Sequence, residues 1–97
     1  MPRMLSLSRG DVILTVNGQY INGRDDCIRA VNASPPTMVF TVRDSRDGTI
    51  WRMQVQLNSR GSRFGVYLAD NPGGGGAYVT SVMRGYPATR CHVLGRE

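Results

Sequence analysis

A short stretch, Arg63-Phe64-Gly65-Val66, carries the residue types and spacing in this 97-residue chain that point most directly to chemistry. A glycine between apolar residues lets the backbone adopt dihedral angles that turn consecutive N–H groups the same way. Such a concave row of amides attracts a carboxylate. Arg60 and Arg63 would add positive charge beside the row. The strand-like run that follows, Val66-Tyr67-Leu68-Ala69, could pair edge to edge with an incoming peptide. The stretch therefore predicts a site for the free C-terminus of another protein chain.

The residues that could do covalent or metal chemistry are few and badly spaced. Cys91 and His92 are adjacent, neither orients the other, and no third group is evident, so they do not predict a catalytic pair. Together with Cys27 they are too few for a zinc site of known spacing. The glycines Gly73 to Gly76 lack the Gly-Lys-Ser/Thr of a phosphate loop. We therefore expect no catalytic residue, no metal and no cofactor, and a protein that is not an enzyme.

The cysteines also bear on the compartment. Cys27 lies in an apolar helical pattern and is expected in the core, whereas Cys91, near the C-terminus, is expected to be exposed. Two cysteines outside a paired motif fit a reduced, intracellular setting. No apolar run approaches the ~20 residues that a membrane span needs, and residues 1–5 lack the long apolar core of a secretory signal. We expect a cytoplasmic protein that reaches membranes only through its partners.

The charge of the chain raises the question of anionic partners. The net charge is +5, and all twelve basic residues are arginines. The arginines are scattered and interleaved with aspartates, without the dense run that nucleic-acid-binding arms show. We therefore expect a mildly basic solvated surface, no specific nucleic-acid partner, and membrane contact that is only indirect or weak. A surface that binds anionic lipid or nucleic acid is kept as an alternative.

Turn signals divide the chain into short strand-like runs and one clear helix. Residues Arg24 to Ala33 carry apolar residues at helical spacing and acids in the first turn, and Ser34-Pro35-Pro36 ends the pattern. Asp11 is expected where a turn at residues 9–11 leads into the first strand, and its carboxylate can cap local amides there. The tail from residue 91 to residue 97 is left unassigned. Strands are expected at 11–16, 19–21, 37–42, 49–57, 64–69 and 77–83, and a second, short helix at 85–89. The pattern predicts one small β-rich barrel or sandwich with a helix against it.

The segment Leu7 to Gly18 has a specific resemblance. It reads Leu-Ser-Arg-Gly-Asp-Val-Ile-Leu-Thr-Val-Asn-Gly and resembles the Leu-x-x-Gly-Asp-x-Ile-Leu-x-Val-Asn-Gly stretch of PDZ domains. Residues 24–42 resemble the second helix and last strand of that family, residues 61–66 its carboxylate-binding loop, and residues 77–88 the strand and short helix that follow. The resemblance implies a mainly β fold with helices (α+β), a partly open barrel or sandwich of five to six strands capped by one long and one short helix.

The order of these segments departs from the common animal pattern, in which the carboxylate-binding loop comes before the Gly-Asp stretch. Joining His92-Val93-Leu94-Gly95 back to Leu5 would restore the common order. One interpretation is a single, circularly permuted PDZ-like domain over residues 1–97, built from segments 1–48 and 49–97, since chain ends usually lie close together. The other is a pair of halves from adjacent repeats, which close on themselves or swap between two copies as a homodimer. PDZ domains of bacterial and plastid proteases are also permuted, so a substrate-recognition domain of a larger protease is an alternative.

The resemblance implies a non-catalytic scaffold module that binds the C-terminal peptides of partner proteins by strand addition. Phe64, Gly65 and Val66 would offer backbone N–H groups to the terminal carboxylate, assisted by Arg60 or Arg63. Val66, Tyr67 and Leu68 would pair with the peptide backbone.

The resemblance also implies a pocket for the ligand's side chains. Phe64, Val66 and Leu68 would line it, Ile28 and Val31 on the helix would close it, and the last ligand residue would be apolar. Arg24 would face the third-from-last ligand residue and tolerate an acidic or polar side chain there, unless a shift of alignment places Asp25 or Asp26 at this position. A simpler interpretation, in which the apolar residues of this set are only core, stays open.

Overall fold

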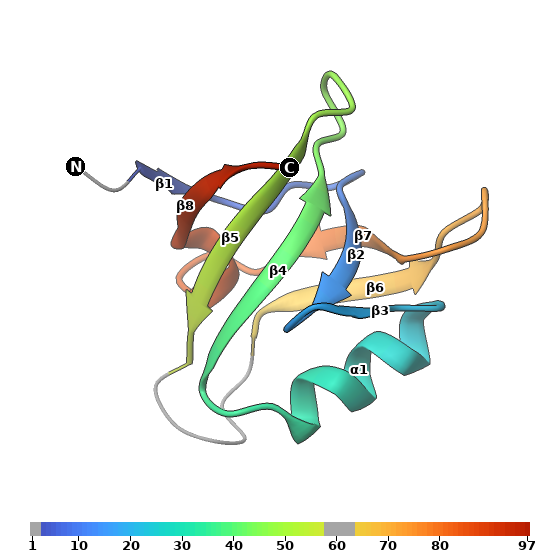
Figure 1. The fold of residues 1–97 in the computed structure, drawn as a ribbon, viewed down its shortest axis with the longest axis horizontal. Helices are drawn as coiled ribbons and strands as arrows, with labels where there is room; N and C mark the ends of the chain where they lie inside the picture. The colour runs from blue at the N-terminus through green and yellow to red at the C-terminus, as the bar shows by residue number, and fades with distance from the viewer. Residues whose placement is uncertain (1–2, 58–63) are drawn as a thin grey trace.

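One curled sheet, shaped like half a barrel, holds eight strands within residues 3–57 and 64–97, which the computed structural model describes (Figure 1). All the strand pairs are antiparallel, and the spatial order is β1-β8-β5-β4-β2-β7-β6, with β3 paired to β2. The strands are β1 (Arg3–Leu5), β2 (Val12–Val16), β3 (Gln19–Tyr20), β4 (Thr37–Arg43), β5 (Ile50–Gln56), β6 (Val66–Asp70), β7 (Ala77–Val82) and β8 (Cys91–Arg96). The helix α1 (Arg24–Ala33) and a short 3-10 helix, η1 (Pro87–Thr89), complete the described fold. The prediction of a small, mainly β fold with a helix is confirmed.

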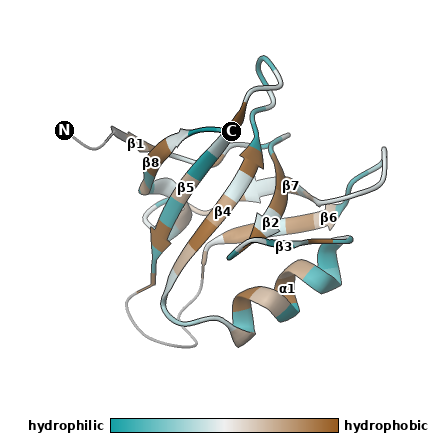
Figure 2. Cartoon of the chain, viewed as in Figure 1, coloured by the Kyte–Doolittle hydropathy of each residue, from teal (hydrophilic) through white to brown (hydrophobic). Residues whose placement is uncertain are grey.

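The hairpin of β4 and β5 shows why these residues form strands. Figure 2 shows hydrophobic and hydrophilic residues alternating along β5, as expected of a strand with one face in the core. The turn is tight, because the N–H of Gly48 donates to the carbonyl of Asp44 over 2.9 Å and that of Asp44 donates to the carbonyl of Thr49 over 2.8 Å. This turn joins segments 1–48 and 49–97 within one sheet.

The core fills the concave side of the sheet. Phe40 of β4 is 1% exposed and stacks on Phe64, with ring centroids 5.1 Å apart and planes at 10°. Cys27 of α1 is fully buried, as predicted. Larger members of the core are Ile13, Met38, Val42, Val55 and Val79.

Asp11 connects two turns at the edge of this core. Its carboxylate accepts the N–H of Ser8 over 2.8 Å and that of Ser45 over 2.9 Å. The predicted capping of local amides is confirmed for Ser8, and the bond to Ser45 adds a link across the sheet.

Two expectations about the ends of the chain were wrong. The expected five to six strands are too few, because β8 forms in the unassigned tail and pairs with β5 on one side and β1 on the other. Cys91 is fully buried, not exposed, because it is the first residue of β8 and faces the core. Proximity to the end of a sequence says little about burial when that end is a paired strand.

The start of α1 is fixed by β6. The helix has no side-chain cap from Gly23, and Asp70 at the end of β6 accepts the N–H of Arg24 over 2.8 Å instead. Asp26 accepts the N–H of Asn22, also over 2.8 Å. Both carboxylates lie at the helix N-terminus, where negative charge is favourable. Neither α1 nor η1 has the length and apolar character needed to cross a membrane.

Candidate functional site

Strand β6 ends the sheet and leaves one of its edges free among the described residues. It pairs with β7 on one side only, from Val66 opposite Val82 to Asp70 opposite Ala77. Tyr67, its second residue, is 56% exposed. A free edge presents backbone N–H and C=O groups to which another extended chain can pair.

The two residues before β6 are held in one conformation by their carbonyl groups. The carbonyl of Phe64 accepts the N–H of Ala88 over 3.1 Å, and that of Gly65 accepts the N–H of Met83 over 2.7 Å. Gly65 has a φ of +92°, and a Cβ there would lie 2.1 Å from the Cβ of Tyr86. Only glycine fits this position without displacing its neighbour.

These bonds determine where the next N–H groups point. A trans peptide carries its C=O and N–H in opposite directions, and no described peptide bond is cis. Since the carbonyls of Phe64 and Gly65 face η1 and the end of β7, the N–H groups of Gly65 and Val66 point away from them. The bond from Met83 to Gly65 also makes Val66 and Val82 a non-hydrogen-bonded pair, so the backbone groups of Val66 face the free edge.

Helix α1 lies next to this edge. It contacts β6, β2 and β7, and Figure 1 shows it alongside β6. Ile28 is 36% exposed, and Val31, Val66 and Leu68 are half-buried against the core. The structure therefore brings the predicted pocket residues of the helix and of β6 to the same side of the molecule.

Phe64 differs from the other predicted pocket residues. It is 8% exposed and its ring is stacked on Phe40 inside the core. Its side chain thus packs in the core beneath the backbone of residues 64–65. The interpretation of Phe64 as a core residue therefore fits best. Its carbonyl, bonded to Ala88, is what orients the next amide.

Two hollows lie at the ends of β6. One, of about 370 Å³, is lined by Phe64, Gly65, Val66, Tyr67 and Met83. The other, of about 220 Å³, lies where α1 begins and is lined by Asn22, Gly23, Asp70, Asn71 and the glycines 74–76. The first therefore lies beside the amides of the loop and the second beside the start of the helix.

Arg24, at the start of α1, lies at the end of β6 opposite to the loop. Its guanidinium pairs with the carboxylate of Asp25 over 2.8 Å, and both side chains are more than half exposed. Asp26 is occupied with Asn22 and lies 3.7 Å from Arg29. The predicted contributions of Arg60 and Arg63 fall outside the described residues.

The two thiols are unsuited to nucleophilic chemistry. Burial raises the pKa of Cys27 to about 12, helped by the nearby Asp26, and burial raises the pKa of Cys91 to about 12. A thiol of this kind is protonated at neutral pH, and the thiolate is the nucleophile. In the part of the chain that the structure describes, no three His, Cys, Asp or Glu residues gather as metal ligands would.

The residues that hold Phe64 and Gly65 in place were not predicted from the sequence. Met83, Tyr86 and Ala88 anchor Phe64 and Gly65, although they come about twenty residues later in the chain. No local pattern identifies them, because their role comes from a close approach of two loops. Asp70, which joins β6 to α1, was missed for the same reason.

Comparisons of the chain with protein-family models, with curated proteins and with solved structures found no match. The described residues form a small, mainly β domain in which the edge strand β6 pairs on one side only, is preceded by outward-facing amides and is flanked by a helix.

Proposed function

We propose that this chain is a PDZ-like, non-catalytic interaction domain that binds the C-terminal peptides of partner proteins. The peptide adds as a strand to the free edge of β6, and its terminal carboxylate binds the N–H groups of Gly65 and Val66. The observation that carries the proposal is the pair of bonds from Ala88 and Met83 to the carbonyls of Phe64 and Gly65. These bonds turn the amides outward before any ligand arrives, which reduces the ordering cost of binding.

Ligand side chains would contact both β6 and α1. Val66 and Leu68 on the strand and Ile28 and Val31 on the helix are partly exposed and apolar, so an apolar last residue such as Val, Leu or Ile fits them. At the other end, the exposed Arg24 favours an acidic or polar residue two positions before the last.

The pairing of the terminal strands supports a single permuted domain. β1 and β8 are antiparallel neighbours, with Met4 opposite His92, and strands from segments 1–48 and 49–97 pair within one sheet. A circular permutation of the PDZ order requires this arrangement, and so do two half-repeats that close on themselves within one chain.

The test compares peptides that differ only at the terminal group. Fluorescently labelled peptides ending in Val, Leu or Ile are titrated as free acids and as C-terminal amides. We expect micromolar affinity for the free acids, and amides weakened roughly tenfold or more, because charge-assisted hydrogen bonds to the carboxylate are lost. Equal affinity of the two forms contradicts the proposal.

A pair of helix variants tests the placement of the peptide. Ile28→Asp puts a charge beside the bound apolar side chain and should weaken binding roughly tenfold or more. Ala33→Asp adds the same charge at an exposed position at the end of α1 and should change affinity by about twofold at most. If both variants bind as the unmodified chain does, the peptide does not lie along α1.

A further inference from the structure

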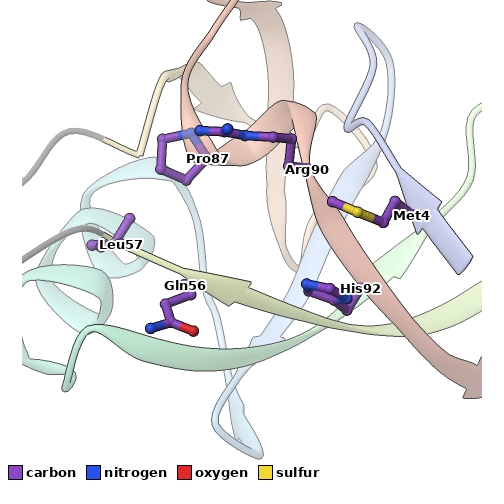
Figure 3. Close-up of a pocket in the computed structure, with 6 residues that line it drawn as sticks. All are labelled: Met4, Gln56, Leu57, Pro87, Arg90 and His92. Carbon is purple, nitrogen blue, oxygen red and sulfur yellow. The ribbon is translucent and has the colours of Figure 1, made fainter. Parts of the chain in front are cut away.

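A separate hollow of about 380 Å³ lies between η1, β8, β1 and the end of β5 (Figure 3). Its size is at the lower end of the ~300–1,000 Å³ range of small-molecule sites. It shares no lining residue with the β6 edge or with α1, so what it binds does not depend on the proposed peptide function. Its lining residues are Met4, Gln56, Leu57, Pro87, Arg90 and His92.

The strand register brings part of this lining together. Met4 lies opposite His92, and His92 lies opposite Gln54 on β5. Gln56 follows two residues later, and alternate residues of a strand share a face, so the side chain of Gln56 is on the same face as these three. Three strands thus contribute to one wall.

The short helix η1 supplies the opposite wall. Ala88 is fully buried, and the N–H of Arg90 donates to the carbonyl of Pro87 over 2.9 Å. The N–H of Thr89 donates to the carbonyl of Tyr86, also over 2.9 Å. These bonds hold the backbone that carries Arg90 in place at the edge of the hollow.

The polar side chains of the hollow are hydrogen-bond donors of the kind that hold anions. Arg90 offers a planar fork of N–H groups, Gln56 a carboxamide NH₂ and His92 a ring N–H. Figure 3 shows Arg90 on one side of the hollow and Gln56 and His92 on the side that faces it. No acidic residue lines it, and within the described ranges neither Arg90 nor His92 has an ion-pair partner.

We propose that this hollow binds a phosphomonoester group attached to a small apolar body. The guanidinium fork can take two oxygens of one anion, and the donors of Gln56 and His92 on the facing wall can take the third oxygen of a tetrahedral phosphate, which a planar carboxylate lacks. Met4, Leu57 and Pro87 provide an apolar surface for the attached group. The net charge of +5 attracts such anions from a distance.

Two sources of this group are separated by the choice of probes. Phenyl phosphate represents a soluble phosphomonoester, and phosphatidic acid in phosphatidylcholine vesicles represents a lipid headgroup. Phenol and pure phosphatidylcholine vesicles, which carry no net charge and no phosphomonoester, are the controls. Binding to phenyl phosphate alone supports the proposal with a soluble ligand, whereas binding to both probes supports it with a headgroup that the hollow can reach.

The decisive variants are Arg90→Gln and Arg84→Gln, each of which removes one exposed arginine. Arg84 lies in the turn after β7 and does not line the hollow. The comparison is made at physiological salt, which screens diffuse electrostatic attraction. Arg90→Gln should lower the affinity for phenyl phosphate roughly tenfold or more. Arg84→Gln should change this affinity by about twofold at most.

Binding is measured by NMR titration of the labelled chain, which also shows whether each variant keeps its fold. We expect the largest shifts at the side-chain signals of Gln56, Arg90 and His92. His92→Gln gives a second, independent variant and should also weaken binding. The proposal is overturned if phenyl phosphate causes no chemical-shift changes at the residues that line the hollow. It is also overturned if the Arg90 and Arg84 variants weaken phenyl phosphate binding equally.

Discussion

Replacing Gly65 by alanine tests whether the close approach of Tyr86 and the positive φ require glycine at this position. A side chain at a φ of +92° is strained, which costs about 1–2 kcal/mol. The added Cβ would also lie 2.1 Å from the Cβ of Tyr86 and 2.8 Å from its Cγ, and forcing such an overlap apart typically costs about 1–3 kcal/mol. We therefore expect Gly65→Ala to lower the free energy of unfolding by about 2–5 kcal/mol, measured by urea denaturation.

Gly48→Ala is the matched control. Gly48 has a φ of +77°, and a Cβ there meets nothing within 4 Å, so only the conformational strain applies. The second control is Tyr86→Gly, which removes the Cβ that an alanine at position 65 would overlap. In a double-mutant cycle, the variant with both changes should have a free energy of unfolding higher by ~1 kcal/mol or more than the sum of the two single effects predicts. If Gly65→Ala costs no more than Gly48→Ala, or if the cycle shows no coupling, the close approach of the two loops is not what requires glycine.

Two further predictions concern Asp11 and the two thiols. Asp11→Ala removes the acceptor of the N–H groups of Ser8 and Ser45 and should lower the free energy of unfolding by about 1–3 kcal/mol, because bonds to a buried carboxylate are lost while water can still reach the two donors. Asp11→Asn keeps one acceptor oxygen and should cost less; urea denaturation of both variants measures this, and equal costs would contradict it. The thiols of Cys27 and Cys91 have a pKa raised from 9.0 to about 12 in the folded chain, so their contribution to stability is complete below pH 9 and is lost as pH rises toward 12. The free energy of unfolding should fall by about 1.4 kcal/mol per thiol and pH unit above pH 9, and a double Cys→Ala variant that keeps the full pH dependence would refute this cause.

Elements with a local signature were predictable. The helix from Arg24 to Ala33 has the predicted bounds, because apolar spacing, acids in the first turn and a following Pro-Pro act within a few residues. The strands predicted at residues 11–16 and 49–57 form at 12–16 and 50–56, since β-formers and alternation mark them.

Elements that depend on distant partners were not predictable. β1 is three residues long, too short for alternation to show, and exists because it pairs with β8 at the other end of the sequence. Cys91 was wrongly expected to be exposed for the same reason. In the candidate site, the residues of β6 and α1 were predictable from pattern and resemblance, whereas the anchors Tyr86 and Asp70 depend on approaches that only the fold creates.

The two edge strands of the sheet, β1 and β6, differ in how readily another chain could pair with them. β1 has three residues, whereas β6 has five and carries no charge before Asp70 and no proline. Such an edge invites pairing unless something limits access to it. A half-domain swap would instead have to open the tight turn from Asp44 to Thr49, where two backbone bonds close the hairpin. A particle of 10.7 kDa in solution that takes up one peptide fits strand addition, whereas a particle of twice that mass before peptide is added would favour the swapped homodimer.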